Sequence, residues 1–93
     1  MRMTIHRAAW DNNIDMLRWL ISHGADINEK GKYKRTALHY AAWQGHIDVM
    51  RLLIAHGAKV NEENAFECAP IHNALHNRHM DAVQLLLDNG AIR

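Results

Sequence analysis

The sequence repeats itself every 33 residues, and this period restricts the fold more than any other feature. Sliding the chain along itself by that distance aligns three copies, in which six columns are identical. These columns are His6, His39, His72; Ala8, Ala41, Ala74; Asp15, Asp48, Asp81; Leu20, Leu53, Leu86; Gly24, Gly57, Gly90; and Ala25, Ala58, Ala91. Self-similarity at a fixed period of about 20 to 50 residues indicates a repeat architecture.

Other columns hold only apolar residues, and they cluster in the second half of each copy. They are Ile14, Ile47, Met80; Met16, Val49, Ala82; Leu17, Met50, Val83; Trp19, Leu52, Leu85; and Ile21, Ile54, Leu87. Residues 47–54 are too broadly apolar for a helix with one solvated face, so we expect neighbours to cover this segment on two sides. Trp19 belongs to one of these apolar columns, and the helical spacing of the columns predicts that its side chain lies in the core.

Each copy is predicted to form two short helices. The first helix of the middle copy is rich in alanine over residues 37–42, which allows close approach to a neighbouring helix. The second begins near residues 45–48 and ends at Gly57, because glycine adopts the left-handed conformation that terminates helices. Gly24 and Gly90 are expected to act in the same way. Pro70 suits the first turn of a helix, where its missing N–H is not needed.

Length, charge and cysteine content narrow the classes of function. The 93 residues indicate one domain, 1–93, with repeats at about 1–30, 31–63 and 64–93. A net charge of +1 gives no overall attraction to nucleic acid or anionic membrane. A single cysteine excludes an internal disulfide and fits a reducing intracellular compartment, the cytoplasm or the nucleus. No apolar run approaches the roughly 20 residues of a membrane span, and the first residues lack a signal-peptide core.

The middle copy carries the most specific motif of the chain. It reads Thr36-Ala37-Leu38-His39, then Tyr40-Ala41-Ala42, Gly45-His46, Leu52-Leu53-Ile54 and Gly57-Ala58-Lys59-Val60-Asn61. These residues closely resemble the ankyrin repeat, and the match covers nearly the whole chain. The resemblance implies an all-α solenoid of stacked helix-turn-helix units with short hairpin-like fingers. It further implies a concave side, made of fingers and first helices, that binds a protein partner without a cofactor or an enzymatic reaction.

The sequence departs from the family pattern in its finger turns and at its ends. The turns carry Gly31 and Lys34 in one finger and Asn64 and Glu67 in the other, where the family usually has an early Asp and a late Gly. A non-glycine residue with positive φ there costs of order 1 kcal/mol. Both ends are abrupt, which leaves three alternatives open. The chain is a segment of a longer array, it self-associates into a homo-oligomer, or substitutions suffice as a cap, namely Asn73, Asn77 and Arg78.

The resemblance also suggests which residues contact a partner. It places Lys32, Tyr33 and Arg35 on one fingertip and Ala65, Phe66 and Cys68 on the next. The first helices end with candidate contacts on the concave side, joined by Tyr40. They are Trp10, Trp43 and His76, followed by Asp11, Gln44 and Asn77. Trp, Tyr and Arg dominate binding hot spots. The alternative is that Trp10 and Trp43 stack on each other, or cover the neighbouring loop, and serve packing alone.

The two fingers carry opposite charges. The first is basic and the second acidic, with Lys30, Lys32, Lys34 and Arg35 in one and Glu62, Glu63 and Glu67 in or beside the other. The period aligns Lys30 with Glu63 and Lys34 with Glu67, which favours pairing between adjacent loops, each exposed pair contributing about 0 to 1 kcal/mol. The alternative is a polar strip that selects a partner by charge. A nucleic-acid partner is disfavoured, because the acidic finger would repel phosphate.

The histidines raise the question of a metal site. His72, His76 and His79 have spacings that would align them on one continuous helix. However, His79 follows the expected end of the first helix, and the chain has no cysteine pair, so we predict no metal site. The resemblance instead implies that His6, His39 and His72 fix helix starts, and that His46 and His79 support the loop between helices. Cys68 is expected to be an exposed thiol, and no catalytic triad or phosphate loop is recognisable.

Overall fold

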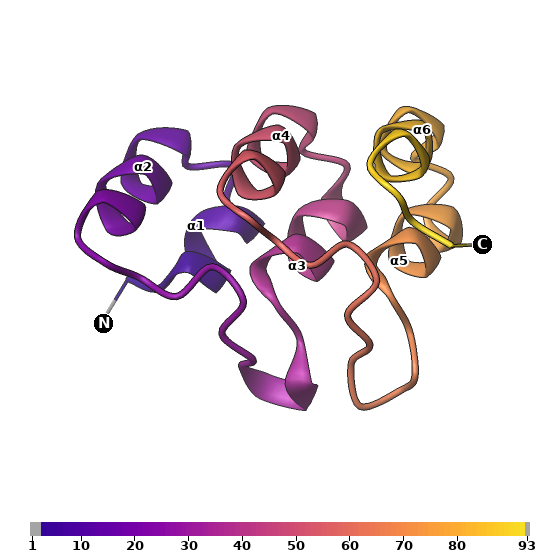
Figure 1. The fold of residues 1–93 in the computed structure, drawn as a ribbon, viewed down its shortest axis with the longest axis horizontal. Helices are drawn as coiled ribbons and strands as arrows, with labels where there is room; N and C mark the ends of the chain where they lie inside the picture. Colours follow the sequence, from indigo (N-terminus) through magenta and orange to yellow (C-terminus); the bar gives the residue numbers. More distant parts are fainter. Residues whose placement is uncertain (1–2, 93) are drawn as a thin grey trace.

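The computed structural model describes residues 3–92, which form six α-helices in three pairs (Figure 1). The pairs are α1 (Ile5–Trp10) with α2 (Ile14–Ser22), α3 (Ala37–Gln44) with α4 (Ile47–Ala55), and α5 (Pro70–His76) with α6 (Met80–Asp88). A short 3₁₀ helix, η1 (Lys32–Lys34), lies between the first two pairs. No β-strand occurs within residues 3–92, so the all-α prediction is confirmed.

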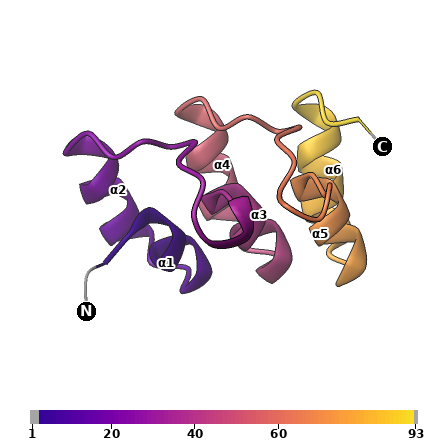
Figure 2. The same cartoon turned by 90° about the horizontal axis from the view of Figure 1, so that it is seen from below.

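The helices form two layers along the longest axis of the molecule. Helix α3 packs between α1 and α5 in one layer, and α4 packs between α2 and α6 in the other (Figure 1). Figure 2 shows the three pairs side by side, with the two described ends of the chain at opposite ends of the row. The arrangement covers α4 on two sides, as its broad apolar content predicts.

Hydrogen bonds to side chains fix the start of each first helix. Thr36 Oγ1 accepts from the His39 N–H at 3.4 Å, and His39 Nδ1 accepts from the Thr36 N–H at 3.0 Å. In the third pair, His72 Nδ1 accepts from the Ala69 N–H at 2.9 Å, and Pro70 occupies the first turn. The predicted role of these two histidines is therefore confirmed.

His6 differs from its two counterparts. Helix α1 begins at Ile5 after the N-cap residue Thr4, one position later in the repeat than α3 and α5 begin. His6 is consequently the second residue of its helix rather than the third, from which a side chain reaches back to the N-cap. Its Nε2 atom instead lies 2.8 Å from the carbonyl oxygen of Glu29.

The loops inside and after the helix pairs use left-handed backbone. Gly24, Gly57 and Gly90 have φ between +89° and +95° and follow the C-cap residues of the second helices, where left-handed glycines were predicted. Gly45 ends α3 with φ of +71°, and a Cβ atom there would lie 2.7 Å from the His79 ring. His79 thus packs against the loop that joins α3 to α4, in line with its predicted supporting role.

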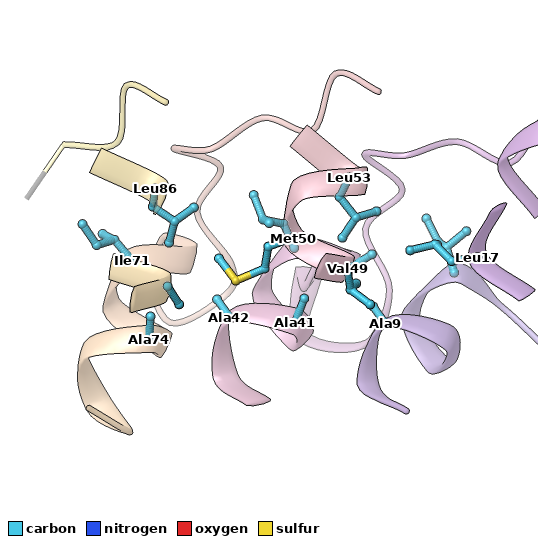
Figure 3. Close-up of a cluster of buried hydrophobic side chains, with 14 of the residues drawn as sticks. Ala9, Leu17, Ala41, Ala42, Val49, Met50, Leu53, Ile71, Ala74 and Leu86 are labelled. Carbon is cyan, nitrogen blue, oxygen red and sulfur yellow. The ribbon is translucent and has the colours of Figure 1, made fainter. Parts of the chain in front are cut away.

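The core lies between the two layers and runs through all three pairs. Alanines of the first helices face larger residues of the second helices across it (Figure 3). The figure labels Ala9, Ala41, Ala42, Ala74 and the larger Ile71 on the first helices, with Leu17, Val49, Met50, Leu53 and Leu86 on the second. Small side chains in one layer let the neighbouring helices approach closely, and the larger ones fill the space at the density of protein interiors.

Trp19 is not in the core, so its assignment from helical spacing is wrong. Its side chain is 54% exposed, and its ring stacks on that of His23 with centroids 3.8 Å apart. The aligned residues Leu52 and Leu85 are partly buried. Helices α4 and α6 each have a preceding helix of their own layer beside them, whereas α2 is the first described helix of that layer.

Two asparagines join successive loops in the same way. Asn28 donates to the Gly57 carbonyl at 3.1 Å and accepts from the Lys59 N–H at 2.8 Å. Asn61 repeats this pair of bonds to the Gly90 carbonyl and the Ile92 N–H, at 3.0 and 2.9 Å. One amide side chain therefore satisfies both a donor and an acceptor of the following copy, which fixes how far the loops are offset.

Candidate functional site

Two loops, residues 30–35 and 63–68, form the first and second fingers. They extend beyond the layer of first helices at the bottom of Figure 1. Two backbone bonds close each finger at aligned positions. The first runs from the Gly31 N–H to the Arg35 carbonyl and from the Asn64 N–H to the Cys68 carbonyl, and the second from the Lys34 N–H to the Gly31 carbonyl and from the Glu67 N–H to the Asn64 carbonyl. The fingers are thus single closed turns rather than strand ladders. Lys34 and Glu67 have φ of 57° and 60°, the strained conformation that their alignment with a usual glycine predicts.

The two fingers keep their shape by different means. In the second finger, the buried side chain of Asn64 accepts from the backbone N–H groups of Phe66 and Cys68, at 2.8 and 3.1 Å. In the first finger, Gly31 occupies the aligned position, where a Cβ atom would lie 3.2 Å from the His6 ring. The role of Asn64 was not found from the sequence, although an asparagine in a turn commonly bonds its own backbone.

The fingertips contact each other. The Ala65 N–H donates to the Tyr33 carbonyl at 2.9 Å, and the rings of Tyr33 and Phe66 lie 5.4 Å apart between centroids. Both rings remain largely exposed, Tyr33 by 50% and Phe66 by 59%. The pair therefore presents an aromatic surface that the fold does not cover.

Arg35 lies among the two fingertip rings and a third ring, that of Tyr40 on α3. Its guanidinium carbon is 5.0 Å from the ring centroid of Tyr33, 5.9 Å from that of Tyr40 and 5.8 Å from that of Phe66. The Lys32 ammonium also lies over Tyr33, at 5.4 Å. Cation–π contacts of this kind each contribute about 0.5 to 1 kcal/mol at exposed sites.

A pocket of about 220 Å³ adjoins Arg35 on the side of the first helices. Residues of all three helix pairs line it, namely Trp10, Arg35, His39, Tyr40, Trp43 and Asn73. A second, wider pocket of about 480 Å³ shares Trp43 and Asn73 with it and extends over α5 to Cys68, His72, Leu75 and His76. The pockets and fingers together form one continuous candidate surface.

The two tryptophans of this surface do not stack on each other, so that part of the packing alternative is wrong; each ring instead contacts a ring of the following copy. The ring of Trp10 meets Tyr40 edge-on, with centroids 5.9 Å apart. Trp43 stacks on His76, with centroids 5.1 Å apart and planes inclined by 17°. Trp10 remains 39% exposed and Trp43 is half-buried, so each keeps a face toward the pocket.

Gln44 and Asn77 use their side chains to hold successive copies together. Gln44 donates to the Trp10 carbonyl at 3.4 Å, and Asn77 donates to the Trp43 carbonyl at 2.8 Å. His46 also approaches the Trp10 carbonyl, through Nε2 at 3.2 Å. A partner that binds these two residues would therefore meet amides that already have an acceptor.

One ion pair joins the neighbourhoods of the two fingers. Lys30 Nζ lies 2.8 Å from the carboxylate of Glu62, and this hydrogen bond lowers the pKa of Glu62. Pairing between adjacent loops is thus observed, but the partner of Lys30 is Glu62 rather than Glu63. The reason is the offset between loops, because Asn28 bonds Lys59 and so brings together residues fewer than 33 positions apart. Within residues 3–92, no ion pair joins Lys34 to Glu67.

The histidines and the thiol of Cys68 were the candidates for a metal site or a reactive group. His79 precedes α6 while α5 ends at His76, as expected from the sequence. Over residues 3–92, no three His, Cys, Asp or Glu side chains are close enough to hold a metal ion. Cys68 is half-buried rather than exposed, with Sγ 3.6 Å from the Phe66 carbonyl, which corrects its expected placement.

A comparison with protein-family models completes this picture. The model for ankyrin repeats matches residues 5–93 in three copies. The chain belongs to the ankyrin repeat family. A search of curated proteins finds no matching sequence. Ankyrin repeats generally mediate protein–protein interactions and form a non-catalytic module. In the described part of this ankyrin repeat protein, no helix has the length and apolar content needed to cross a membrane.

Proposed function

We propose that this ankyrin repeat protein binds a protein partner through its fingertips and the ends of its first helices. The proposed contacts are Trp10, Lys32, Tyr33, Arg35, Tyr40, Trp43, Gln44, Phe66, His76 and Asn77. The aromatic surface around the smaller pocket is the observation that carries this proposal. Trp, Tyr and Arg side chains supply most hot-spot energy in interfaces, and five of the six pocket residues are aromatic, histidine or arginine.

The exposed rings at the fingertips support the same surface. Large apolar side chains are exposed at Tyr33 and Phe66, next to the cations of Lys32 and Arg35. A partner that covered these rings would remove apolar area from water, which stabilises a complex by about 25 cal/mol per Å² before the costs of association. Gln44 and Asn77 contribute less in this scheme, because their amides already bond backbone carbonyls.

Affinity purification with quantitative mass spectrometry tests the proposal. The immobilised chain is compared with Trp43→Ala and Phe66→Ala, and Trp19→Ala serves as the matched control because it removes an exposed tryptophan from outside the surface. We expect both site variants to lose the same captured proteins while the control retains them. Circular dichroism establishes that the variants are folded. Equal capture by all four proteins would refute the surface assignment.

A second candidate function is self-association of the end copies. The exposed side chains of Trp19 in the first copy and of Met80 and Ile92 in the third favour it. Light scattering over a range of concentrations tests it. We expect the apparent molecular mass to increase with protein concentration. Trp19→Ser and Met80→Ser should reduce this increase, whereas Phe66→Ala should leave it unchanged. A wild-type chain that stays monomeric at every concentration removes this candidate.

A further inference from the structure

Arg35 has an unusual environment for a basic residue of a finger. Its guanidinium contacts the rings of Tyr33, Tyr40 and Phe66. Within residues 3–92 the ion pairs are Arg7 with Asp11 and Lys30 with Glu62, and neither includes Arg35. The fold therefore positions this cation without neutralising it.

This arrangement prepares the guanidinium for a planar anion. Arginine presents a rigid fork of N–H donors that matches a carboxylate through two parallel hydrogen bonds. The surrounding rings limit the rotamers of the side chain, so less conformational entropy is lost when an anion binds. The rings also replace water at part of the site, and a charge interaction is stronger where water is partly excluded.

The neighbouring pocket has the dimensions of a site for one side chain. Its volume of about 220 Å³ is smaller than the roughly 300 to 1,000 Å³ of typical small-molecule sites. Trp10, Tyr40 and Trp43 supply aromatic walls, and edge-to-face contacts between rings are favourable. An aromatic side chain of a partner fits this lining better than a charged one.

The charges around the pocket indicate which sign of charge the bound segment of the partner carries. Lys30 is neutralised by Glu62, but Lys32, Lys34 and Arg35 form no ion pair within residues 3–92. The adjoining second finger carries the carboxylates of Glu63 and Glu67. These two negative charges stand against the three cations of Lys32, Lys34 and Arg35, so the two fingers together keep a net positive charge beside the aromatic pocket. Among the described residues that line the pocket, Arg35 is the only cation, and one guanidinium balances a single negative charge rather than a phosphate dianion.

We propose that the surface recognises an acidic segment of the partner, with an Asp or Glu carboxylate on Arg35 and an adjacent aromatic side chain in the pocket. This inference rests on the proposed function and adds the chemistry of the bound segment. The carboxylate and the ring must be near each other in the segment, because Arg35 itself lines the pocket.

Labelled peptides of defined composition test this inference on the whole chain. Short Gly/Ser peptides carry one Asp and one Trp at several separations and in both orders, with acetylated and amidated ends so that the Asp side chain is their only carboxylate. Matched peptides replace Asp by Asn, Asp by phosphoserine, or Trp by Ala. Binding is measured by fluorescence anisotropy, and the indole N–H signals of Trp10 and Trp43 are followed by NMR.

We expect the best Asp/Trp peptide to bind about tenfold or more tightly than its Asn counterpart, as for a hydrogen bond to a charged group. Arg35→Gln should remove this preference and Arg35→Lys should reduce it, because lysine lacks the planar fork. Arg51→Gln, which changes an exposed arginine on α4, is the matched control and should retain the preference.

Three results would overturn the inference. They are equal affinity for the Asp and Asn peptides, tighter binding of the phosphoserine peptide, and no binding of any peptide by the wild-type chain. None of them bears on capture of a partner by the aromatic surface, so the proposed function is judged separately by affinity purification. Equal capture by all four proteins in that assay, together with a retained Asp preference here, would show that the pocket binds acidic peptides without being the site of the captured partner.

Discussion

The imidazole of His39 donates from Nε2 to the carbonyl oxygen of Cys68 at 2.8 Å, and so joins helix α3 to the following finger. The other nitrogen, Nδ1, accepts from the Thr36 N–H at 3.0 Å, which assigns the ring hydrogen to Nε2 in the neutral form. The residue is 1% exposed, and burial lowers the pKa of its imidazole below the ordinary value of 6.5. A neutral histidine thus bridges two copies in the middle of the stack.

Stability should therefore decrease in acid through His39. The pKa of His39 is lower in the folded chain than in the unfolded chain, so the unfolded chain binds the proton more readily. The stability that the neutral ring contributes is therefore complete above pH 6.5 and is lost as the pH falls toward the folded pKa. Urea unfolding across this range measures the effect. His39→Gln should unfold about 1 to 3 kcal/mol more easily at neutral pH, because it leaves buried partners unsatisfied, and its stability should vary less with pH. Parallel pH profiles for both proteins would contradict this assignment.

Gly45 and Gly57 offer a matched comparison of backbone strain with steric overlap. Both have positive φ, +71° and +93°, but a Cβ atom at Gly45 would lie 2.7 Å from the His79 ring, whereas Gly57 has open space. Gly57→Ala should cost about 1 to 2 kcal/mol from the left-handed backbone alone. Gly45→Ala should cost more, because its ring neighbour must also move.

A double-mutant cycle separates the two contributions at Gly45. His79→Ala removes the overlapping ring, so Gly45→Ala should cost less in that background than in the wild-type chain. The measured quantity is the free energy of unfolding in urea. Equal costs in the two backgrounds would show that the His79 ring moves away freely.

The asparagines between loops predict a graded loss of stability. Asn28→Ala removes two hydrogen bonds to the following copy and should cost about 1 to 3 kcal/mol, given about 0.5 to 1.5 kcal/mol for each bond. Asn28→Asp keeps the acceptor for the Lys59 N–H, but it replaces the donor by a carboxylate oxygen that faces the Gly57 carbonyl oxygen, so it should also be less stable than the wild-type chain. Thermal unfolding measures the three proteins, and an Asp variant as stable as the wild-type chain would contradict the assigned bonds.

The repeating columns predict the helices and the core because burial in this fold follows the period. Leu53 is buried in the middle copy with neighbours on both sides, and the alanines at Ala41 and Ala42 are buried where close approach was expected. The same argument failed for Trp19, because a column predicts burial only if its copy has a neighbour on the relevant side. Periodicity within one chain does not contain that information.

The candidate site was predicted less completely, for a different physical reason. The resemblance to ankyrin repeats selected Trp10, Trp43, Tyr33 and Phe66 as a group, and all four occur at the pockets or fingertips. It did not predict that Arg35 lies among three rings, because long side chains have many rotamers and their contacts are set in three dimensions. The pairing of Lys30 with Glu62 likewise depends on the loop offset, which the Asn28 bonds determine.

Asn73 gives the last prediction, because its side-chain oxygen is buried without a hydrogen-bond partner among residues 3–92. Its Oδ1 atom is buried and has no hydrogen-bond partner within the described residues, although the side chain lines both pockets. An unsatisfied buried acceptor costs about 1 to 3 kcal/mol, and replacing it by an apolar group of similar shape is nearly neutral or stabilising. Asn73→Leu should therefore unfold at the same or a higher urea concentration than the wild-type chain. Asn77→Leu is the control and should be destabilised, since its amide bonds the Trp43 carbonyl. If Asn73→Leu is instead destabilised as much as Asn77→Leu, the Asn73 amide stabilises the free fold and the pocket contains no unsatisfied group.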